Sequence, residues 1–108
     1  METNPLDERL PERLKREEIK ELFRGGTFRR GKVLTILYKK GRGKVAFTIK
    51  RGKLKAHERN RIKRLLREAY RKNKILFKGF DVVLIGNKNM LKYKSFEVEK
   101  ELIKTWKC

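Results

Sequence analysis

The segment RNRIKRLLREAYR, residues 59–71, carries six basic side chains and one acidic side chain on a pattern typical of an amphipathic helix. Its apolar residues recur at helical spacing and predict a stripe that faces the core: Ile62, Leu65, Leu66, Ala69 and Tyr70. The opposite side carries Asn60, Lys63, Arg64, Arg67 and Arg71. Because like charges along one helical face repel each other, this face adds nothing to the stability of the isolated fold. The basic side of this helix is therefore explained by binding to a partner and not by the stability of the fold.

Positive charge is concentrated in the middle of the chain. The 108 residues include 32 Lys and Arg against 13 Asp and Glu, which gives a formal net charge of +19. Residues 31–80 hold 18 basic and 2 acidic side chains, so +16 of this charge lies within that stretch. Solvated surfaces usually interleave both signs, and a one-signed excess opposes compaction unless a polyanion shares the site. The charge pattern predicts a partner with a phosphate backbone.

The composition excludes several classes of protein. A chain of 108 residues is expected to form a single domain, 1–108, with residues 1–12 as a flexible lead. No apolar run is long enough to span a membrane, and the stretch METNPLDERL lacks the apolar core of a signal peptide, so we expect a cytoplasmic protein. Cys108 is the only cysteine, which rules out a disulfide framework and a cysteine-based metal site.

The segments before residue 59 predict a helix followed by strands. KREEIKELFRGG, residues 15–26, places Ile19, Leu22 and Phe23 on one helical face and ends at a glycine pair. VLTILYK (33–39) and KVAFTIK (44–50) are rich in β-branched and aromatic residues, and the glycines between them favour a hairpin. We therefore expect these two strands to pair antiparallel, with a short extra strand near Thr27 to Arg29.

The remaining segments predict one more strand and a last helix. FDVVLIGN, residues 80–87, is a near-continuous apolar run of strand length, as in a strand buried within a sheet. In SFEVEKELIKTWK, residues 95–107, Val98, Leu102 and Trp106 can share one helical face. The order αββαβα predicts an α+β sandwich with a small sheet.

Residues suited to catalysis are scarce. The chain has one histidine, His57, and one serine, Ser95, and the basic region holds only Glu58 and Glu68 as acids. A catalytic triad needs a base held by a third group, and metal-assisted phosphodiester cleavage usually needs clustered carboxylates. We therefore expect no catalytic and no metal-ligating residue, and we assign His57 to helix entry or RNA contact.

The triplet Arg59-Asn60-Arg61, followed by basic residues at helical spacing, resembles the signature of the bacterial ribonuclease P protein subunit family. The similarity extends to the segments around it. LKREEIKELFRGGT (14–27) is similar to the family's first helix, VAFTIKR (45–51) to the strand before the signature, and KGFDVVLIGNK (78–88) to the strand after it. The resemblance therefore covers nearly the whole chain, from about Arg9 to Trp106.

The resemblance implies a fold and a function. The fold would be a sandwich of the ribosomal-protein-S5-domain-2-like type with a mixed sheet and an unusual left-handed βαβ crossover through the basic helix, where general rules favour the right hand. The chain would assist a large catalytic RNA that removes the 5′ leader of precursor tRNA, with magnesium held chiefly by that RNA and no obligate protein partner. The residues implied to bind the RNA subunit are Arg59, Asn60, Arg61, Lys63, Arg64, Arg67 and Arg71.

The family also holds the single-stranded leader in a cleft between the first helix and the sheet. The positions that this implies here are Ile19, Phe23, Leu37, Tyr38, Thr48, Lys50 and Arg51. Ile19 stands where the family places an aromatic residue, and Leu54 stands where it usually has a glycine, for which Gly52 is a substitute. Because a one-residue slip exchanges the two faces of a strand, the register decides which of Leu37 and Tyr38 faces the cleft.

Two other classes of protein share part of this pattern. A structural RNA-binding protein like those of the ribosome has the same size and charge but not the triplet. A helix-turn-helix DNA-binding protein would use residues 59–71 as a recognition helix and would need a compact helical neighbour rather than strands. A stand-alone nuclease is disfavoured by the shortage of acids.

Overall fold

The computed structural model describes residues 12–107. Their helices are α1 (Arg16–Gly25), α2 (Ala56–Lys72) and α3 (Ser95–Lys107), and the strands are β1 (Thr27–Arg30), β2 (Leu34–Lys40), β3 (Val45–Ile49) and β4 (Phe80–Gly86). Two short 3-10 helices, η2 (Lys74–Phe77) and η3 (Lys88–Lys92), flank β4. The helices and strands expected from the sequence are all present, including the short strand β1, while η2 and η3 were not predicted.

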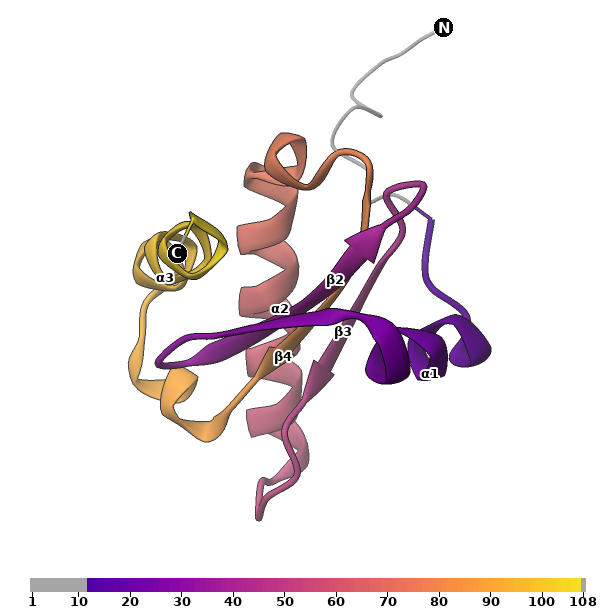
Figure 1. The fold of residues 1–108 in the computed structure, drawn as a ribbon. Helices are drawn as coiled ribbons and strands as arrows, with labels where there is room; N and C mark the ends of the chain where they lie inside the picture. The colour runs from indigo at the N-terminus through magenta and orange to yellow at the C-terminus, as the bar shows by residue number, and fades with distance from the viewer. Residues whose placement is uncertain (1–11, 108) are drawn as a thin grey trace, which may run out of the picture.

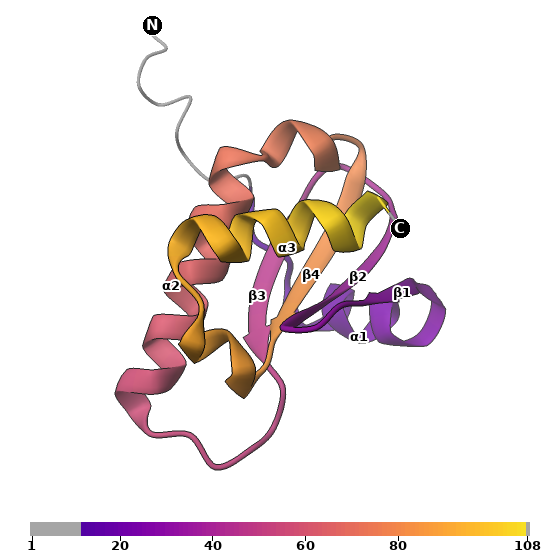
Figure 2. The same cartoon turned by 90° about the vertical axis from the view of Figure 1, so that its left-hand side faces the viewer.

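The four strands form one mixed sheet between two helical layers (Figure 1). The strand order is β1-β2-β4-β3, in which β3 and β4 run parallel and the other neighbouring pairs run antiparallel. Helix α1 lies against one face, and α2 and α3 cover the other, as the second view also shows (Figure 2). The predicted α+β sandwich with a small mixed sheet is confirmed.

The predicted hairpin between β2 and β3 is wrong, because β4 lies between these strands and pairs with both. Val82, Val83 and Leu84 of β4 are fully buried, so this strand needs neighbours along both edges and cover on both faces. Residues 41–44 instead cross the end of β4, where the Gly41 N–H donates to the Gly79 carbonyl at 2.9 Å. The burial of β4 between β2 and β3 therefore outweighs the local glycine pattern that favours a hairpin.

Helix α2 connects the parallel strands β3 and β4, as expected. It begins three residues before the quoted segment, at Ala56, and buries all five residues of the predicted stripe: Ile62, Leu65, Leu66, Ala69 and Tyr70. The left hand of this crossover stays a prediction.

All three helices begin with the pattern Lys-x-x-Glu. In each, the glutamate carboxylate accepts the backbone N–H of the preceding lysine at 2.8 Å, and the glutamates are Glu18 in α1, Glu58 in α2 and Glu97 in α3. This contact satisfies an N–H that the helix cannot pair, and the negative charge is favourable near the helix N-terminus. The few acids of this basic chain are thus placed where they define helix starts.

The larger core lies between the sheet and the helices α2 and α3. Val98 and Leu102 of α3 are fully buried there, and Trp106 packs against this core from the last turn, which confirms the predicted face. Arg29 joins β1 to this helix, because its Nε donates to the Tyr38 hydroxyl at 3.2 Å and its Nη1 donates to the Trp106 carbonyl. Its guanidinium also lies over the Tyr38 and Trp106 rings.

The smaller core lies under α1 and consists of Leu14, Leu22, Leu37, Ala46 and Val83. Of the three residues predicted to share the apolar face of α1, only Leu22 is fully covered. Ile19 packs at the edge of this core, and 48% of the Phe23 surface is exposed. Phe23 is therefore available for contacts outside the core.

Candidate nucleic-acid interface

The exposed side of α2 forms a continuous polar and cationic surface, which we call the basic face. A shallow hollow of about 500 Å³ on it is lined by His57, Asn60, Arg61, Lys63, Arg64 and Arg67, all of them exposed. These residues come together because the helical repeat turns the apolar stripe of α2 toward the sheet and this side toward solvent. The sequence therefore placed this surface correctly.

The two remaining residues that were expected on this face lie at its margins. Arg59 is exposed in the first turn of α2 but does not line the hollow. Arg71 is half-buried, and its guanidinium lies 3.8 Å from the Glu68 carboxylate. The arginines 59, 61 and 64, by contrast, have no carboxylate within ion-pair distance among residues 12–107. Their charge is thus open to an external anion.

A second hollow, which we call the sheet groove, lies beside α1 on the opposite face of the sheet. Its volume is about 470 Å³, and it is lined by Phe23, Phe28, Arg30, Thr35, Thr48, Ile49, Lys50, Arg51 and Ile85. The strand register explains the floor, because Arg30 pairs with Thr35, Thr35 with Ile85, and Ile85 with Thr48 across all four strands. Residues paired in this way point to the same face of a sheet.

Two phenylalanines form an aromatic pair at the groove. The Phe23 and Phe28 ring centroids are 6.0 Å apart, and the two residues remain 48% and 41% exposed, respectively. Three cations, Arg30, Lys50 and Arg51, line the same hollow. Exposed aromatic faces beside cations are the elements that bind single-stranded nucleic acid, through base stacking and phosphate contact.

Four of the residues predicted to contact a leader line this groove: Phe23, Thr48, Lys50 and Arg51. Ile19 does not, because it packs against the smaller core. Leu37 faces the α1 side, two residues along β2 from Thr35 of the groove floor, but is fully covered there. Tyr38 points to the other face, where its ring centroid lies 4.8 Å from that of Trp106. Neither Leu37 nor Tyr38 is positioned to touch a molecule in the groove.

The sequence missed five residues of the groove: Phe28, Arg30, Thr35, Ile49 and Ile85. A period-two pattern in TFRR, residues 27–30, does put Phe28 and Arg30 on one face of β1. The sequence did not show whether this face of β1 lies on the α1 side of the sheet, because the pairing of β1 with β2 decides it.

The loop from Lys50 to Lys55 leads from the groove to α2. Its Leu54 packs against the larger core, and Gly52 does not have a positive φ angle. A small hollow beside this loop is lined by Lys50, Arg51, Gly52, Leu54, Asn87, Lys88 and Asn89. The loop thus holds Lys50 and Arg51 with ordinary backbone geometry, and no glycine is required at position 54.

An ion pair holds α1 beside the groove. The Lys44 ammonium lies 2.9 Å from the Glu18 carboxylate and 3.9 Å from that of Glu12. The Lys15 backbone N–H and the Lys44 side chain, which both donate to Glu18, lower the pKa of this carboxyl. The hydrogen bond to Glu18 likewise raises the pKa of Lys44. Glu18 is therefore tied at once to the start of its own helix and to the β2–β3 connection.

Residues 12–107 contain neither a cluster of metal ligands nor a membrane-spanning helix. No group of three or more His, Cys, Asp or Glu side chains could hold a metal ion within this part of the chain. None of its helices is long and apolar enough to cross a membrane.

Comparison with known proteins identifies the family. The model of the family described as Ribonuclease P matches residues 9–108. The chain belongs to the ribonuclease P protein family. Its structure is similar to that of the RNase P protein from Thermotoga maritima, with a TM-score of 0.78 and 29% sequence identity over 90% of this chain and 96% of that one. The Staphylococcus aureus RNase P protein shares the fold at a TM-score of 0.74 and 15% identity, over 87% of this chain and 90% of that one.

Curated members of this family show sequence similarity over shorter segments. The ribonuclease P protein component of Baumannia cicadellinicola is 35% identical over 77 residues, which are 70% of this chain and 64% of the relative. That of Pseudoalteromonas atlantica is 40% identical over 53 residues, which are 49% of this chain and 44% of the relative. The chain thus matches less than two thirds of the length of these relatives.

The Glu18 ion pair predicts a pH-dependent contribution to stability. Because the folded pKa of Glu18 is lowered, this contribution is complete above the ordinary carboxyl pKa and is lost as the pH falls through the folded value. Glu18→Gln keeps an oxygen that can accept the Lys15 N–H but removes the charge. We expect its melting temperature to be below that of the wild type at neutral pH and to converge with it as the pH is lowered to about 2.

The matched control is Glu17→Gln, which removes an exposed charge from the same turn of α1. Thermal unfolding followed by circular dichroism at a series of pH values makes the comparison. An equal and pH-independent effect of the two substitutions would show that the contact between Glu18 and Lys44 does not stabilise α1.

Proposed function

We propose that this chain is the protein subunit of a bacterial ribonuclease P, which acts in the cytoplasm. It binds the catalytic RNA and the 5′ leader of precursor tRNA and assists the removal of that leader. The observation that carries this proposal is the presence, on a member of this family, of two separate cationic surfaces. The basic face and the sheet groove lie on different sides of the molecule, so each can contact a different RNA segment.

The basic face suits a structured RNA backbone. It presents Arg61, Lys63, Arg64 and Arg67 along a rigid helix without acids in the lining. Arginine can engage a phosphate through two parallel hydrogen bonds, and Asn60 can contact a phosphate, sugar or base without adding charge. We assign this face to the RNA subunit, because a fixed array of cations matches a folded polyanion and is relieved of its self-repulsion on binding.

The sheet groove suits the single-stranded leader. Phe23 and Phe28 offer faces on which a base can stack, and Arg30, Lys50 and Arg51 can neutralise the adjoining phosphates. The threonines on its floor add hydroxyl groups that can hydrogen-bond to the RNA backbone. This combination favours a flexible strand, because a paired base is not free to stack on a protein side chain.

The chemistry of cleavage is assigned to the RNA partner. Magnesium, held chiefly by that RNA, would supply charge stabilisation and an activated water for phosphodiester hydrolysis. The role of this chain is to bind and position the two RNAs and to screen their mutual repulsion. Such screening should lower the magnesium concentration that the reaction requires.

Reconstitution tests the proposed function directly. The chain, mixed with a bacterial ribonuclease P RNA and precursor tRNA at low magnesium, should stimulate removal of the leader at the mature 5′ end. The purified chain alone, with the same substrate and magnesium, should release no leader. Cleavage at that site by the protein alone, abolished by His57→Ala, would contradict an RNA-based active site.

Substitutions on the basic face should weaken binding to the RNA subunit. Arg59, Arg61 and Arg64 are exposed and make no ion pair with a described residue, so their triple replacement by alanine should leave the fold intact. For every phosphate that is no longer neutralised, the magnitude of the salt slope should fall by up to about 0.9, a value taken from duplex DNA. Filter binding at several salt concentrations measures both the affinity and the slope.

The control removes the same charge elsewhere. Lys92, Lys100 and Lys107 are exposed and line neither the basic face nor the sheet groove. Their replacement by alanine should change the affinity for the RNA subunit much less. Equal reductions in affinity for the two triple variants would mean that net charge, and not the geometry of α2, governs binding.

Substitutions in the groove should act through the leader. Phe23→Ala and Phe28→Ala should each reduce holoenzyme affinity for precursor tRNA by roughly 1 to 3 kcal/mol if one base stacks on each ring. Affinity for mature tRNA, which lacks the leader, should be unchanged. Phe96→Ala, at a similarly exposed phenylalanine of α3, is the matched control. Equal reductions for precursor and mature tRNA, in a variant that still folds and binds the RNA subunit, would remove that residue from the leader site.

A further inference from the structure

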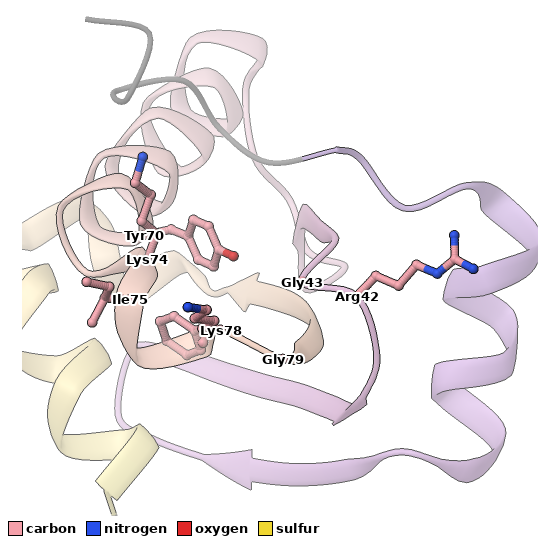
Figure 3. Close-up of a pocket in the computed structure, with 8 residues that line it drawn as sticks. Arg42, Gly43, Tyr70, Lys74, Ile75, Lys78 and Gly79 are labelled. Atoms are coloured by element: carbon pink, nitrogen blue, oxygen red, sulfur yellow. The ribbon is translucent and has the colours of Figure 1, made fainter. Parts of the chain in front are cut away.

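Another hollow lies at the C-terminal end of α2. Its volume is about 360 Å³, and it is lined by Arg42, Gly43, Tyr70, Lys74, Ile75, Phe77, Lys78 and Gly79 (Figure 3). None of these residues lines the basic face or the sheet groove. We call this hollow the η2 pocket, because most of its lining comes from η2 and the turns that flank it.

Tyr70 contributes an unpaired polar group to this pocket. The residue is 1% exposed, and its hydroxyl has no hydrogen-bond partner among residues 12–107. In Figure 3 this hydroxyl points toward the turn at Gly43, into the space between the lining residues. Burial, with a smaller contribution from Asp81, raises the pKa of Tyr70 to about 12, so the phenol remains a donor at neutral pH. A buried donor without a partner is costly unless something in the pocket accepts from it.

The pocket combines positive charge with an apolar wall. Lys74, Lys78 and Arg42 have no ion-pair partner within the described part of the chain, although Arg42 extends away from the centre of the pocket in Figure 3. The Tyr70 and Phe77 rings stack with centroids 5.2 Å apart. Ile75, which is 80% exposed, adds an apolar side chain at the rim. The lining thus offers anion contacts and a hydrophobic surface side by side.

Asp81, the acid that acts on Tyr70, is held by hydrogen bonds within the protein. The Asp81 carboxylate accepts the backbone N–H groups of Arg42 at 3.1 Å and Lys44 at 3.0 Å. The hydrogen bond from the Gly41 N–H to the Gly79 carbonyl also joins the β2–β3 connection to the residue that precedes β4. These contacts fix the wall of the pocket and direct the Asp81 charge to the backbone of the turn, which leaves the lysines for an external anion.

We propose that the η2 pocket binds one nucleotide of single-stranded RNA. Its phosphate contacts Lys74, Lys78 and the Tyr70 hydroxyl, and its base lies against Ile75. The inference rests on the proposed function only for the source of the RNA, which is the RNA subunit or precursor tRNA. It adds an RNA contact at the C-terminal end of α2 and in η2, beyond the basic face.

The first test uses the free protein and a mononucleotide. Adenosine monophosphate should shift the amide NMR signals of Tyr70, Ile75 and Gly79, and it should bind more tightly than either adenosine or inorganic phosphate. Tyr70→Phe should weaken this binding about tenfold, the effect of removing one hydrogen bond to a charged group. The double variant Lys74→Ala/Lys78→Ala removes two cations and should weaken it more than Tyr70→Phe does. The charge-matched control is Lys92→Ala/Lys100→Ala, which should bind as the wild type does.

Tyr70→Phe keeps the ring and removes only the unpaired hydroxyl, so its melting temperature should equal or exceed that of the wild type. Unchanged nucleotide affinity in both pocket variants would overturn the proposal. Inorganic phosphate that binds as tightly as the mononucleotide would overturn the assignment of a base to Ile75.

The second test uses the assembled holoenzyme. Ile75 is replaced by the photoreactive p-benzoylphenylalanine, with the same replacement at the exposed Phe96 of α3 as control. Irradiation should link position 75, and not position 96, to RNA, and separate labelling of the RNA subunit and the precursor tRNA identifies the source. Leader removal is measured first in each holoenzyme. Absence of a cross-link at position 75 in an active holoenzyme would overturn the η2 pocket while leaving the proposed function intact.

Discussion

The structure depends on the burial of β4 between β2 and β3. Alternate residues of this strand face opposite cores, with Val82 and Leu84 toward α2 and α3 and Val83 toward α1. Full burial of a valine or leucine side chain contributes roughly 1.5 to 3 kcal/mol, so removing the cover from either face would cost several times that amount. The helices therefore lie on both sides of the sheet, where they cover both faces of β4.

The position of β4 also determines how the chain connects. Because β4 separates β2 from β3, residues 41–44 must cross its end, and α2 must return the chain from β3 to the start of β4. The first connection forms a wall of the η2 pocket, and the second carries the basic face. The surfaces rich in cations are thus built on the two connections and on the sheet face that α1 leaves open.

The cations of this chain lie on separate surfaces, which lowers their mutual repulsion and allows a compact fold at a net charge of +19. The basic face lies on the exposed side of α2, and Arg30, Lys50 and Arg51 lie around the sheet groove on the other side of the sheet. The scarce acids serve local purposes, since Glu18, Glu58 and Glu97 begin the helices and Asp81 holds a turn. Under the proposed function, bound RNA would relieve the repulsion that remains within each surface.

The amino-acid sequence was sufficient for the features that depend on one segment at a time. Helical spacing placed Asn60, Arg64 and Arg67 together on the exposed side of α2, because residues three and four apart are neighbours on any helix. Helical spacing likewise predicted the face shared by Val98, Leu102 and Trp106. The strand β4 was recognised for another reason, because a strand buried on both faces is apolar along nearly its whole length. Membership of the ribonuclease P protein family, first indicated by the triplet at 59–61, was confirmed by comparison.

Only the tertiary structure decided which strands are neighbours and which face of each is covered. A period of two divides a strand into two faces without saying where either one points, so Leu37 and Tyr38 could not be told apart until β2 was aligned with β1 and β4. The same alignment put Arg30, Thr35, Ile85 and Thr48 in one row and Phe28 beside Phe23. Strand pairing joins residues far apart in the chain, and the burial of β4 outweighed the glycine signal for a hairpin between β2 and β3.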